Sequence, residues 1–179
     1  MQAHQDVILL ENDQLQVGIV PAVGASICSF KYKLDNHWVD MMRPTPESAI
    51  SDNEPGKFSS FNMIPYSNRI KDGILVYKAH SYQLAINSAD GHAIHGEVRT
   101  RPWKVAFRTQ TELDLDFNST EYPGISWPFA FTARVRFRLE ANRFSIITSV
   151  QNLSSEEAPA GMGIHPYFVR SLTEQDDQV

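Results

Sequence analysis

Two of the six histidines stand in settings that could aim an imidazole at a ligand. His95 precedes Gly96, which permits close approach of the backbone, in a segment typical of a strand beside a turn. His165 precedes Pro166, which disfavours the helical conformation of the residue before it, so we expect His165 to be extended. Imidazoles titrate near neutral pH and suit acid and base catalysis, although a single histidine is more often a satisfied core residue.

An Asn-Arg pair, Asn68 and Arg69, lies between an apolar approach that contains Pro65 and a turn at Gly73. The amide and the guanidinium present hydrogen-bond donors in fixed planes, which suits the hydroxyl groups of a sugar or a carboxylate. The alternative, which the pattern favours equally, is an arginine that ties a loop to backbone carbonyls.

The composition describes one folded domain, over residues 1–179, that must hold these side chains in place. The chain is 42% hydrophobic and 21% charged, which is typical of globular proteins. A net charge of −5 argues against nonspecific binding to nucleic acid or anionic lipid. The first residues lack a secretory signal, no apolar run could span a bilayer, and the single Cys28 cannot form an internal disulfide. We therefore expect a cytoplasmic protein without a membrane or nucleic-acid partner.

The elements that position these residues are predicted to be strands, because apolar residues recur with a period of two. Leu113, Leu115 and Phe117 alternate with acidic residues, and the segment 131–139 alternates in the same way with arginines. No segment offers three turns of an amphipathic helix. Strands are expected at 5–10, 15–20, 26–32, 74–77, 82–86, 104–108, 111–117, 131–139 and 144–150. We predict an all-β fold of stacked antiparallel sheets.

Two charged rows and one loop bear on where a ligand could bind. The rows are Arg134, Arg136 and Arg138 on one expected strand and Glu112, Asp114 and Asp116 on another. A row of guanidiniums could bind a glycan or a phosphate, but the pattern favours pairing of opposite charges across neighbouring strands. The segment 41–57 has the composition of a loop, and we expect it to lie over a cleft.

Three motifs follow one another along the chain. They are Pro-Tyr-Ser-Asn-Arg-Ile-Lys-Asp-Gly at 65–73, His-Ala-Ile-His-Gly-Glu-Val-Arg at 92–99 and Gly-Met-Gly-Ile-His-Pro-Tyr-Phe at 161–168. Together they resemble the aldose 1-epimerase (galactose mutarotase) family, and the similarity runs along essentially the whole chain. The resemblance implies an antiparallel β-supersandwich of which this chain is the N-terminal portion. We therefore expect a single domain that is incomplete at its C-terminus.

The resemblance also implies a reaction, the interconversion of the α and β anomers of a hexose such as galactose or glucose, with no cofactor and no metal. It assigns His165 as the acid that protonates the ring oxygen and His95 as its assistant. The residues that would contact the sugar are Asn68, Arg69, His95 and Tyr167. Three aromatic residues could stack on the sugar, although a core position is the favoured interpretation of each: Phe61, Tyr66 and Trp127.

The general base of the family is a glutamate near the C-terminus of the domain, so we expect it beyond residue 179. Within the chain Glu97 is the best substitute by geometry, since residues 95 and 97 of one strand would share a face, but it is disfavoured because nothing in the resemblance gives it that role. An incomplete sandwich would leave sheet edges unpaired and apolar side chains such as Phe144, Ile146 and Val150 partly uncovered. Such edges could drive self-association.

Two other functions stay open. A sugar sensor or inactive carbohydrate-binding domain would keep the sugar contacts and lack a base. A sugar-phosphate epimerase would need extra cations, for which Arg99 and Arg101 are the nearby candidates. A metal site built from His92, His95 and His165 is disfavoured, because His92 and His95 would fall on opposite faces of a strand.

Overall fold

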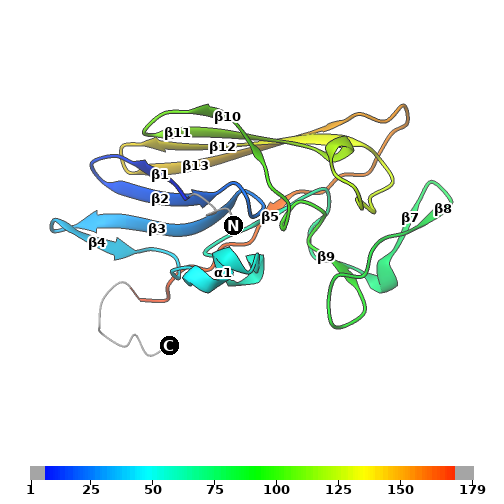
Figure 1. Cartoon of the computed structure of the whole chain (residues 1–179), viewed down its shortest axis with the longest axis horizontal. Coiled ribbons are helices and arrows are strands. Elements are labelled where there is room, and N and C mark those ends of the chain that lie inside the picture. The colour runs from blue at the N-terminus through cyan, green and yellow to red at the C-terminus, as the bar shows by residue number, and fades with distance from the viewer. Residues whose placement is uncertain (1–6, 172–179) are drawn as a thin grey trace.

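The computed structural model describes residues 7–171, and strands form most of its regular structure (Figure 1). Two four-stranded antiparallel sheets dominate, in the orders β1-β2-β3-β4 and β10-β11-β12-β13. The first contains β1 (Ile8–Glu11), β2 (Leu15–Val20), β3 (Ser26–Leu34) and β4 (His37–Asp40). The second contains β10 (Lys104–Arg108), β11 (Glu112–Asn118), β12 (Phe131–Glu140) and β13 (Arg143–Asn152). The predicted all-β antiparallel fold is confirmed, and within residues 7–171 no helix is long and apolar enough to cross a membrane.

One apolar core joins the two large sheets, and the alternation is clearest in β12, where every second residue is buried. Fully buried side chains come from both sheets: Leu10, Val17, Ile19, Leu113, Leu115, Val135 and Phe137. At the edge of this core Phe30 of β3 lies against Phe144 of β13, with ring centroids 5.1 Å apart. The strands therefore stack as the layers of a sandwich.

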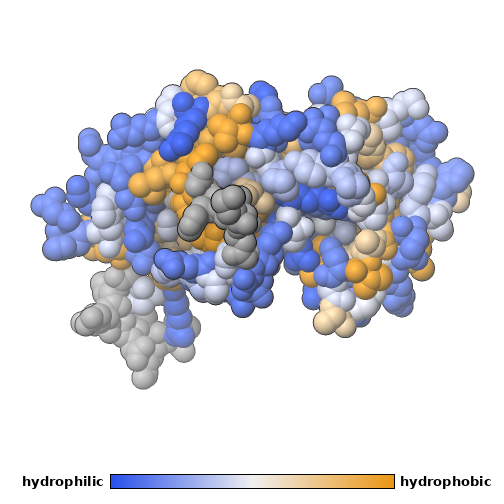
Figure 2. Space-filling view, in the orientation of Figure 1, coloured by the Kyte–Doolittle hydropathy of each residue, from blue (hydrophilic) through white to orange (hydrophobic). Residues whose placement is uncertain are grey.

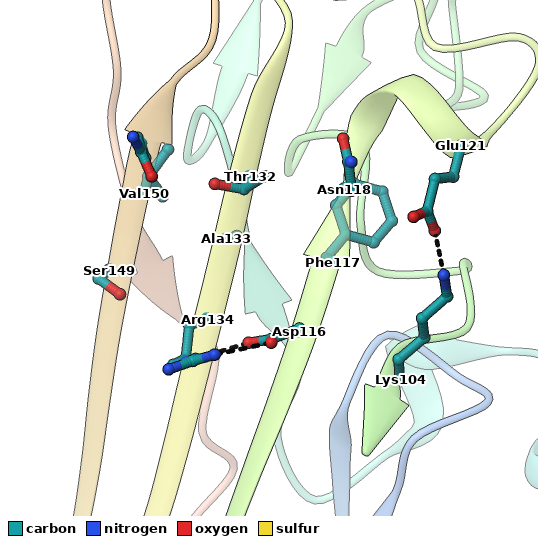
Figure 3. A pocket seen from close by; sticks show the side chains of 11 residues that line it. Lys104, Asp116, Phe117, Asn118, Glu121, Thr132, Ala133, Arg134, Ser149 and Val150 are labelled. Atoms are coloured by element: carbon teal, nitrogen blue, oxygen red, sulfur yellow. Dashed lines mark hydrogen bonds and ion pairs between the residues drawn. The ribbon is translucent and has the colours of Figure 1, made fainter. Parts of the chain in front are cut away.

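The charged rows pair across β11 and β12, as the sequence predicts. The register places Glu112 opposite Arg138, Asp114 opposite Arg136 and Asp116 opposite Arg134. A hollow of about 630 Å³ lies on this polar face, where the Arg134 guanidinium donates to Asp116 and Lys104 pairs with Glu121 at 2.6 Å (Figure 3). None of the predicted catalytic or sugar-binding residues lines the hollow.

Short strands form three further pairs, and each of the three motifs contains one of these strands. They are β5 (Asn62–Met63) paired with β14 (Gly163–Ile164), β6 (Arg69–Ile70) paired with β9 (Ala93–Ile94), and β7 (Ile74–Tyr77) paired with β8 (His80–Gln83). The helix α1 (Glu47–Ser51) and 3-10 turns at Pro55–Lys57, Lys71–Gly73 and Ser119–Glu121 complete the described elements. The pairings β5 with β14 and β6 with β9 bring segments that are distant in sequence side by side.

The predicted strand at 82–86 is wrong in its bounds, since β8 spans His80–Gln83. Lys78 and Ala79 both have positive φ, 47° and 64°, and form a two-residue turn that fixes the register of the hairpin. Because β7 has four residues, the same register pairs four residues of β8. The other predicted strands are present, and residues 5 and 6 of the first lie outside the described residues.

Candidate active site

His95 is held where two of the motifs touch. It follows β9 in a left-handed conformation, with φ of 61°, and its backbone N–H donates to the carbonyl of Asn68 at 2.9 Å. Gly96 has φ of 75°, and a Cβ there would lie 2.0 Å from the carbonyl oxygen of Ile64. The same carbonyl accepts the N–H of Glu97 at 2.7 Å. The close approach that Gly96 predicts is therefore confirmed, and it fixes the position of His95.

His165 lies on an extended segment that continues the pairing of β14 with β5. Its N–H donates to the carbonyl of Phe61, and the N–H of Tyr167 donates to the carbonyl of Ser59, both at 2.9 Å. Hydrogen bonds from alternate residues are typical of a strand. The extended conformation that Pro166 predicts for this segment therefore agrees with its hydrogen bonds.

The two imidazoles meet within a frame of aromatic rings. The His95 and His165 rings lie edge to face, with centroids 5.5 Å apart and planes at 76°. Phe61 stacks on His165 at 4.8 Å and contacts His95 at 5.6 Å, while Tyr167 stacks on His165 at 4.7 Å. Phe61 is itself buried, so its ring packs under the imidazoles. The fold thus brings His95 of the second motif against His165 of the third, with Tyr167 of the same third motif beside it.

The surroundings of His95 favour its neutral form. Burial, followed by the neighbours Arg99, His165 and Arg69, lowers the pKa of His95 to about 4. Its Nδ1 is buried and has no hydrogen-bond partner within residues 7–171. A neutral imidazole has one N–H donor and one acceptor nitrogen. At physiological pH His95 is therefore suited to give a ligand one hydrogen bond rather than a charge.

Arg69 and Asn68 lie at the exposed rim beside His95. Arg69 pairs across β6 and β9 with Ile94, and its Nε donates to Asp90 at 2.8 Å. Asn68 is exposed, with φ of 56°. The Ser88 hydroxyl also donates to Asp90, and Ser88 and Arg69 together lower the pKa of Asp90 to about 2. Asp90, which the sequence analysis missed, is an acidic residue of a loop with no pattern to single it out.

The side chain of Glu97 has a structural role, so its interpretation as a substitute base is wrong. Its Oε1 accepts the N–H groups of Ser126 and Trp127, each at 3.1 Å, and also the Ser126 hydroxyl. Its Oε2 lies 3.7 Å from the guanidinium of Arg101. The expected shared strand face with His95 is absent, because the positive φ of Gly96 ends the extended backbone between them.

The two candidate cations differ in what they contact. Arg101 donates to the carbonyls of Glu97, Pro123 and Gly124, so it serves the local backbone. Arg99 is half-buried and has no carboxylate partner within the described residues, and its hydrogen bond to a backbone carbonyl is long, at 3.4 Å. Its charge acts on His95, and burial lowers its own pKa. Arg99 is therefore a cation of the site, although no motif beyond its place in 92–99 distinguishes it.

The remaining aromatic candidates belong to the core. Tyr66 and Trp127 are buried and stack on each other, with ring centroids 5.5 Å apart. Burial and the charge of Glu97 raise the pKa of Tyr66 to about 12, so it stays a neutral phenol. The core interpretation of these two residues is confirmed.

His92 is engaged in a turn, where its Nδ1 accepts the N–H of Asp72 at 3.2 Å. Across residues 7–171 no three His, Cys, Asp or Glu side chains are grouped as metal ligands. The site is therefore described by its two imidazoles, the aromatic rings around them and the arginines at its rim.

A family comparison agrees with this geometry. A sequence model of the aldose 1-epimerase family matches residues 6–177. The chain belongs to the aldose 1-epimerase family. YihR, an uncharacterized protein of Escherichia coli K12, is 35% identical over 117 residues, which cover 64% of this chain and 37% of YihR. This family membership confirms the resemblance that the three motifs carry.

Solved structures of mutarotase-like proteins share the fold. A galactose mutarotase-like protein from Clostridium acetobutylicum matches with a TM-score of 0.78 at 24% identity, over 94% of this chain and 52% of that one. A galactose mutarotase related enzyme from Lactobacillus acidophilus matches with a TM-score of 0.75 at 24% identity, over 96% and 52%. The epimerase-family chain thus spans about half the length of these proteins, or less for YihR.

Proposed function

We propose that the chain forms the acid and sugar-binding part of a mutarotase site for a hexose such as galactose or glucose. The observation that carries this proposal is the contact between His95 and His165 inside one aromatic frame, beside Arg69. Mutarotation needs a base that takes the proton of the anomeric hydroxyl and an acid that protonates the ring oxygen. The bond between the anomeric carbon and the ring oxygen then breaks, and reclosure after rotation gives the other anomer.

Each residue has a role in this scheme. His165 gives its proton to the ring oxygen and takes it back on reclosure, as acid and base catalysis requires. His95, kept neutral, donates a hydrogen bond near the same oxygen. Asn68 and Arg69 hold hydroxyl groups at the rim, and Tyr167 forms a wall beside His165. Asp90 orients Arg69 through their 2.8 Å hydrogen bond.

The base is proposed to lie outside residues 1–179, in sequence that completes the domain. Two observations support this placement. The carboxylate of Glu97 is occupied by backbone and hydroxyl donors. The causes that lower the pKa of His95 include the charges of Arg99 and Arg69 and no carboxylate of the described residues. The chain alone is therefore expected to bind sugar and to accelerate mutarotation weakly.

The experiment combines polarimetry of freshly dissolved α-galactose and α-glucose with sugar binding measured by saturation-transfer NMR. We expect binding and a measurable acceleration, and H165Q should lower the acceleration by about 10²-fold or to background while binding persists. D116N, on the polar face of β11, is the control and should match the wild type. Absence of both binding and acceleration would overturn the proposal. Binding with no acceleration, unchanged by H165Q, would favour the carbohydrate sensor.

Arg99 favours a second candidate, a sugar-phosphate epimerase. A half-buried guanidinium beside His95, with no carboxylate partner among residues 7–171, could bind a phosphate or carboxylate of the substrate. Binding of glucose 6-phosphate and of glucose would be compared in the wild type, in R99Q and in R134Q, a control on the polar face. This candidate requires tighter binding of the phosphate by the wild type and loss of that preference only in R99Q. Equal affinity for both sugars would exclude it.

A further inference from the structure

The segment that precedes α1 lies against the His165 strand. The N–H of Arg43 donates to the carbonyl of Tyr167 at 2.9 Å, and the N–H of Val169 donates to the carbonyl of Met41 at 3.1 Å. On its other side the same strand bonds to the segment 59–63. The segment 41–57 is not a plain loop, since it contains α1 and a 3-10 turn, and its first residues flank the strand that presents His165.

The side chain of Arg43 ends on the ring of Tyr167. Its guanidinium carbon lies 3.6 Å from the ring centroid, close contact even for a cation and an aromatic face. Its Nε and one terminal nitrogen donate to the carbonyl of Phe58 at 3.2 and 3.0 Å, and that nitrogen also donates to the carbonyl of Gly56. No carboxylate within residues 7–171 pairs with it. The guanidinium plane is therefore held by carbonyl oxygens and covers the ring.

These contacts continue to the imidazole. Tyr167 stacks on His165 with planes at 28°, and Phe61 stacks on His165 with planes at 19°. We call Arg43, Tyr167, His165 and Phe61 the ring stack. A tilted imidazole would lose contact with both neighbouring rings, and a displaced Tyr167 would release one of them. The guanidinium of Arg43 thus contacts Tyr167, and Tyr167 in turn contacts the His165 imidazole.

We propose that Arg43 is a positioning residue, which fixes the orientation of the His165 imidazole by holding Tyr167 against it. The claim that Arg43 fixes the orientation of the imidazole is independent of the proposed function. The expected effect on catalysis rests on that function. A purely structural role as a tether is the competing explanation. Backbone bonds already attach this segment to the strand, and Thr45 adds another, since its Oγ1 accepts the N–H of Ser59 at 2.9 Å.

The first test follows the His165 ring itself by NMR, through its carbon–proton correlations and its NOEs to Phe61. We compare wild type with R43Q, R43K and T45V, the last as a control that loosens the same segment outside the ring stack. In R43Q and R43K the NOEs should weaken and the ring signals shift, because neither side chain offers a planar guanidinium. In T45V they should persist. Unchanged NOEs in R43Q, recovery in R43K, or an equal loss in T45V would each overturn the inference.

The second test measures mutarotation at a temperature where every variant is folded, as judged by circular dichroism. R43Q should lower kcat about tenfold or more with KM within about twofold, since a misaligned acid affects the transition state and not sugar binding. T45V should keep both constants. A rise in KM alone in R43Q would contradict a positioning role. The NMR readout needs no turnover, so a chain without activity would overturn the proposed function and leave the role of Arg43 to be decided by the ring signals.

Discussion

The two histidines of the site differ in what surrounds them, and this difference supports different roles. His95 is pinned by a glycine turn among cationic neighbours, and its pKa of about 4 keeps it neutral. A neutral ring has no spare proton to deliver at physiological pH, although it still donates one hydrogen bond. His165 is set between stacking rings on an extended strand, where its plane is controlled. This difference supports the proposal that His165 is the proton donor and His95 the neutral hydrogen-bond donor.

The lowered pKa of His95 predicts a pH dependence of stability. The unfolded chain binds a proton at this residue near pH 6.5, whereas the folded chain binds it only near pH 4. Between these values the unfolded state holds more protons, so the free energy of unfolding falls as the pH is lowered from about 6.5 to about 4. In H95Q the free energy of unfolding should fall less steeply with pH than in the wild type. The difference in slope should correspond to less than one proton, and urea unfolding at pH 7, 6 and 5 measures it.

The control for loss of an imidazole is H80Q, at an exposed histidine of β8. Parallel pH profiles of the wild type and H95Q would show that the proton uptake lies elsewhere.

At the scale of single residues, the sequence predicts site residues that have a distinctive local sequence. It misses those whose role comes from contacts with residues distant in the sequence. His95, Gly96 and His165 stand out because glycine and proline restrict their backbone. Arg43 and Asp90 do not stand out in the sequence. Arg43 contacts the ring of Tyr167 and Asp90 contacts the guanidinium of Arg69, and both partners are distant in the sequence. The structural role of Glu97 is hidden for the same reason, since its partners Ser126 and Trp127 come from another loop.

At the scale of elements, the paired charges of β11 and β12 show how burial changes the contribution of an ion pair to the stability of the fold. Arg136 donates to both oxygens of Asp114 at 2.7 and 2.6 Å, and Arg134 donates to Asp116 at 2.6 and 2.7 Å. The geometry of the pairs is alike, but the Asp114 side chain is 6% exposed and the Asp116 side chain 40%. Only the buried carboxylate lacks water as a substitute partner.

We therefore expect D114N to destabilise the fold by about 1–3 kcal/mol and D116N by about 0–1 kcal/mol. The hydrogen bonds of Arg136 hold the pKa of Asp114 below its usual range. This stabilisation is present at neutral pH and is lost as the pH falls below about 4, so the difference between wild type and D114N should shrink there. Urea unfolding at pH 7 and pH 3 measures both effects, and equal losses in the two variants would contradict the argument.

The elements that alternate over six or more residues are predictable, and the shortest ones are not. The segments β11 and β12 show a clear period of two in the sequence. The strands β5, β6, β9 and β14 have two residues each, too few for any period. These short pairings depend on which distant segments meet, and they are the ones that assemble the site.

At the scale of the whole molecule, the second sheet ends at β13. Within the described chain β13 pairs with β12 alone, over ten residues with its charge at one end, Arg143. The apolar side chains expected to be partly uncovered, Phe144, Ile146 and Val150, are half-buried, and Ile147 on the other face is 56% exposed. Apolar surface gathers over the strands of the two large sheets (Figure 2). A long apolar edge strand of this kind is a template for another strand.

We therefore predict that the chain self-associates through β13 and that a charge within this edge weakens the association. Ile147 pairs with Arg136 of the neighbouring strand β12, so I147E should be tolerated by the fold while two such edges repel each other. V76E is the matched control, because Val76 is 65% exposed on the β7–β8 hairpin. Sedimentation over a range of concentrations should show association weakened about tenfold or more in I147E and retained in V76E. Two results would contradict the prediction that β13 forms an interface between copies. One is a wild-type chain that stays monomeric at every concentration, and the other is self-association weakened equally in I147E and V76E.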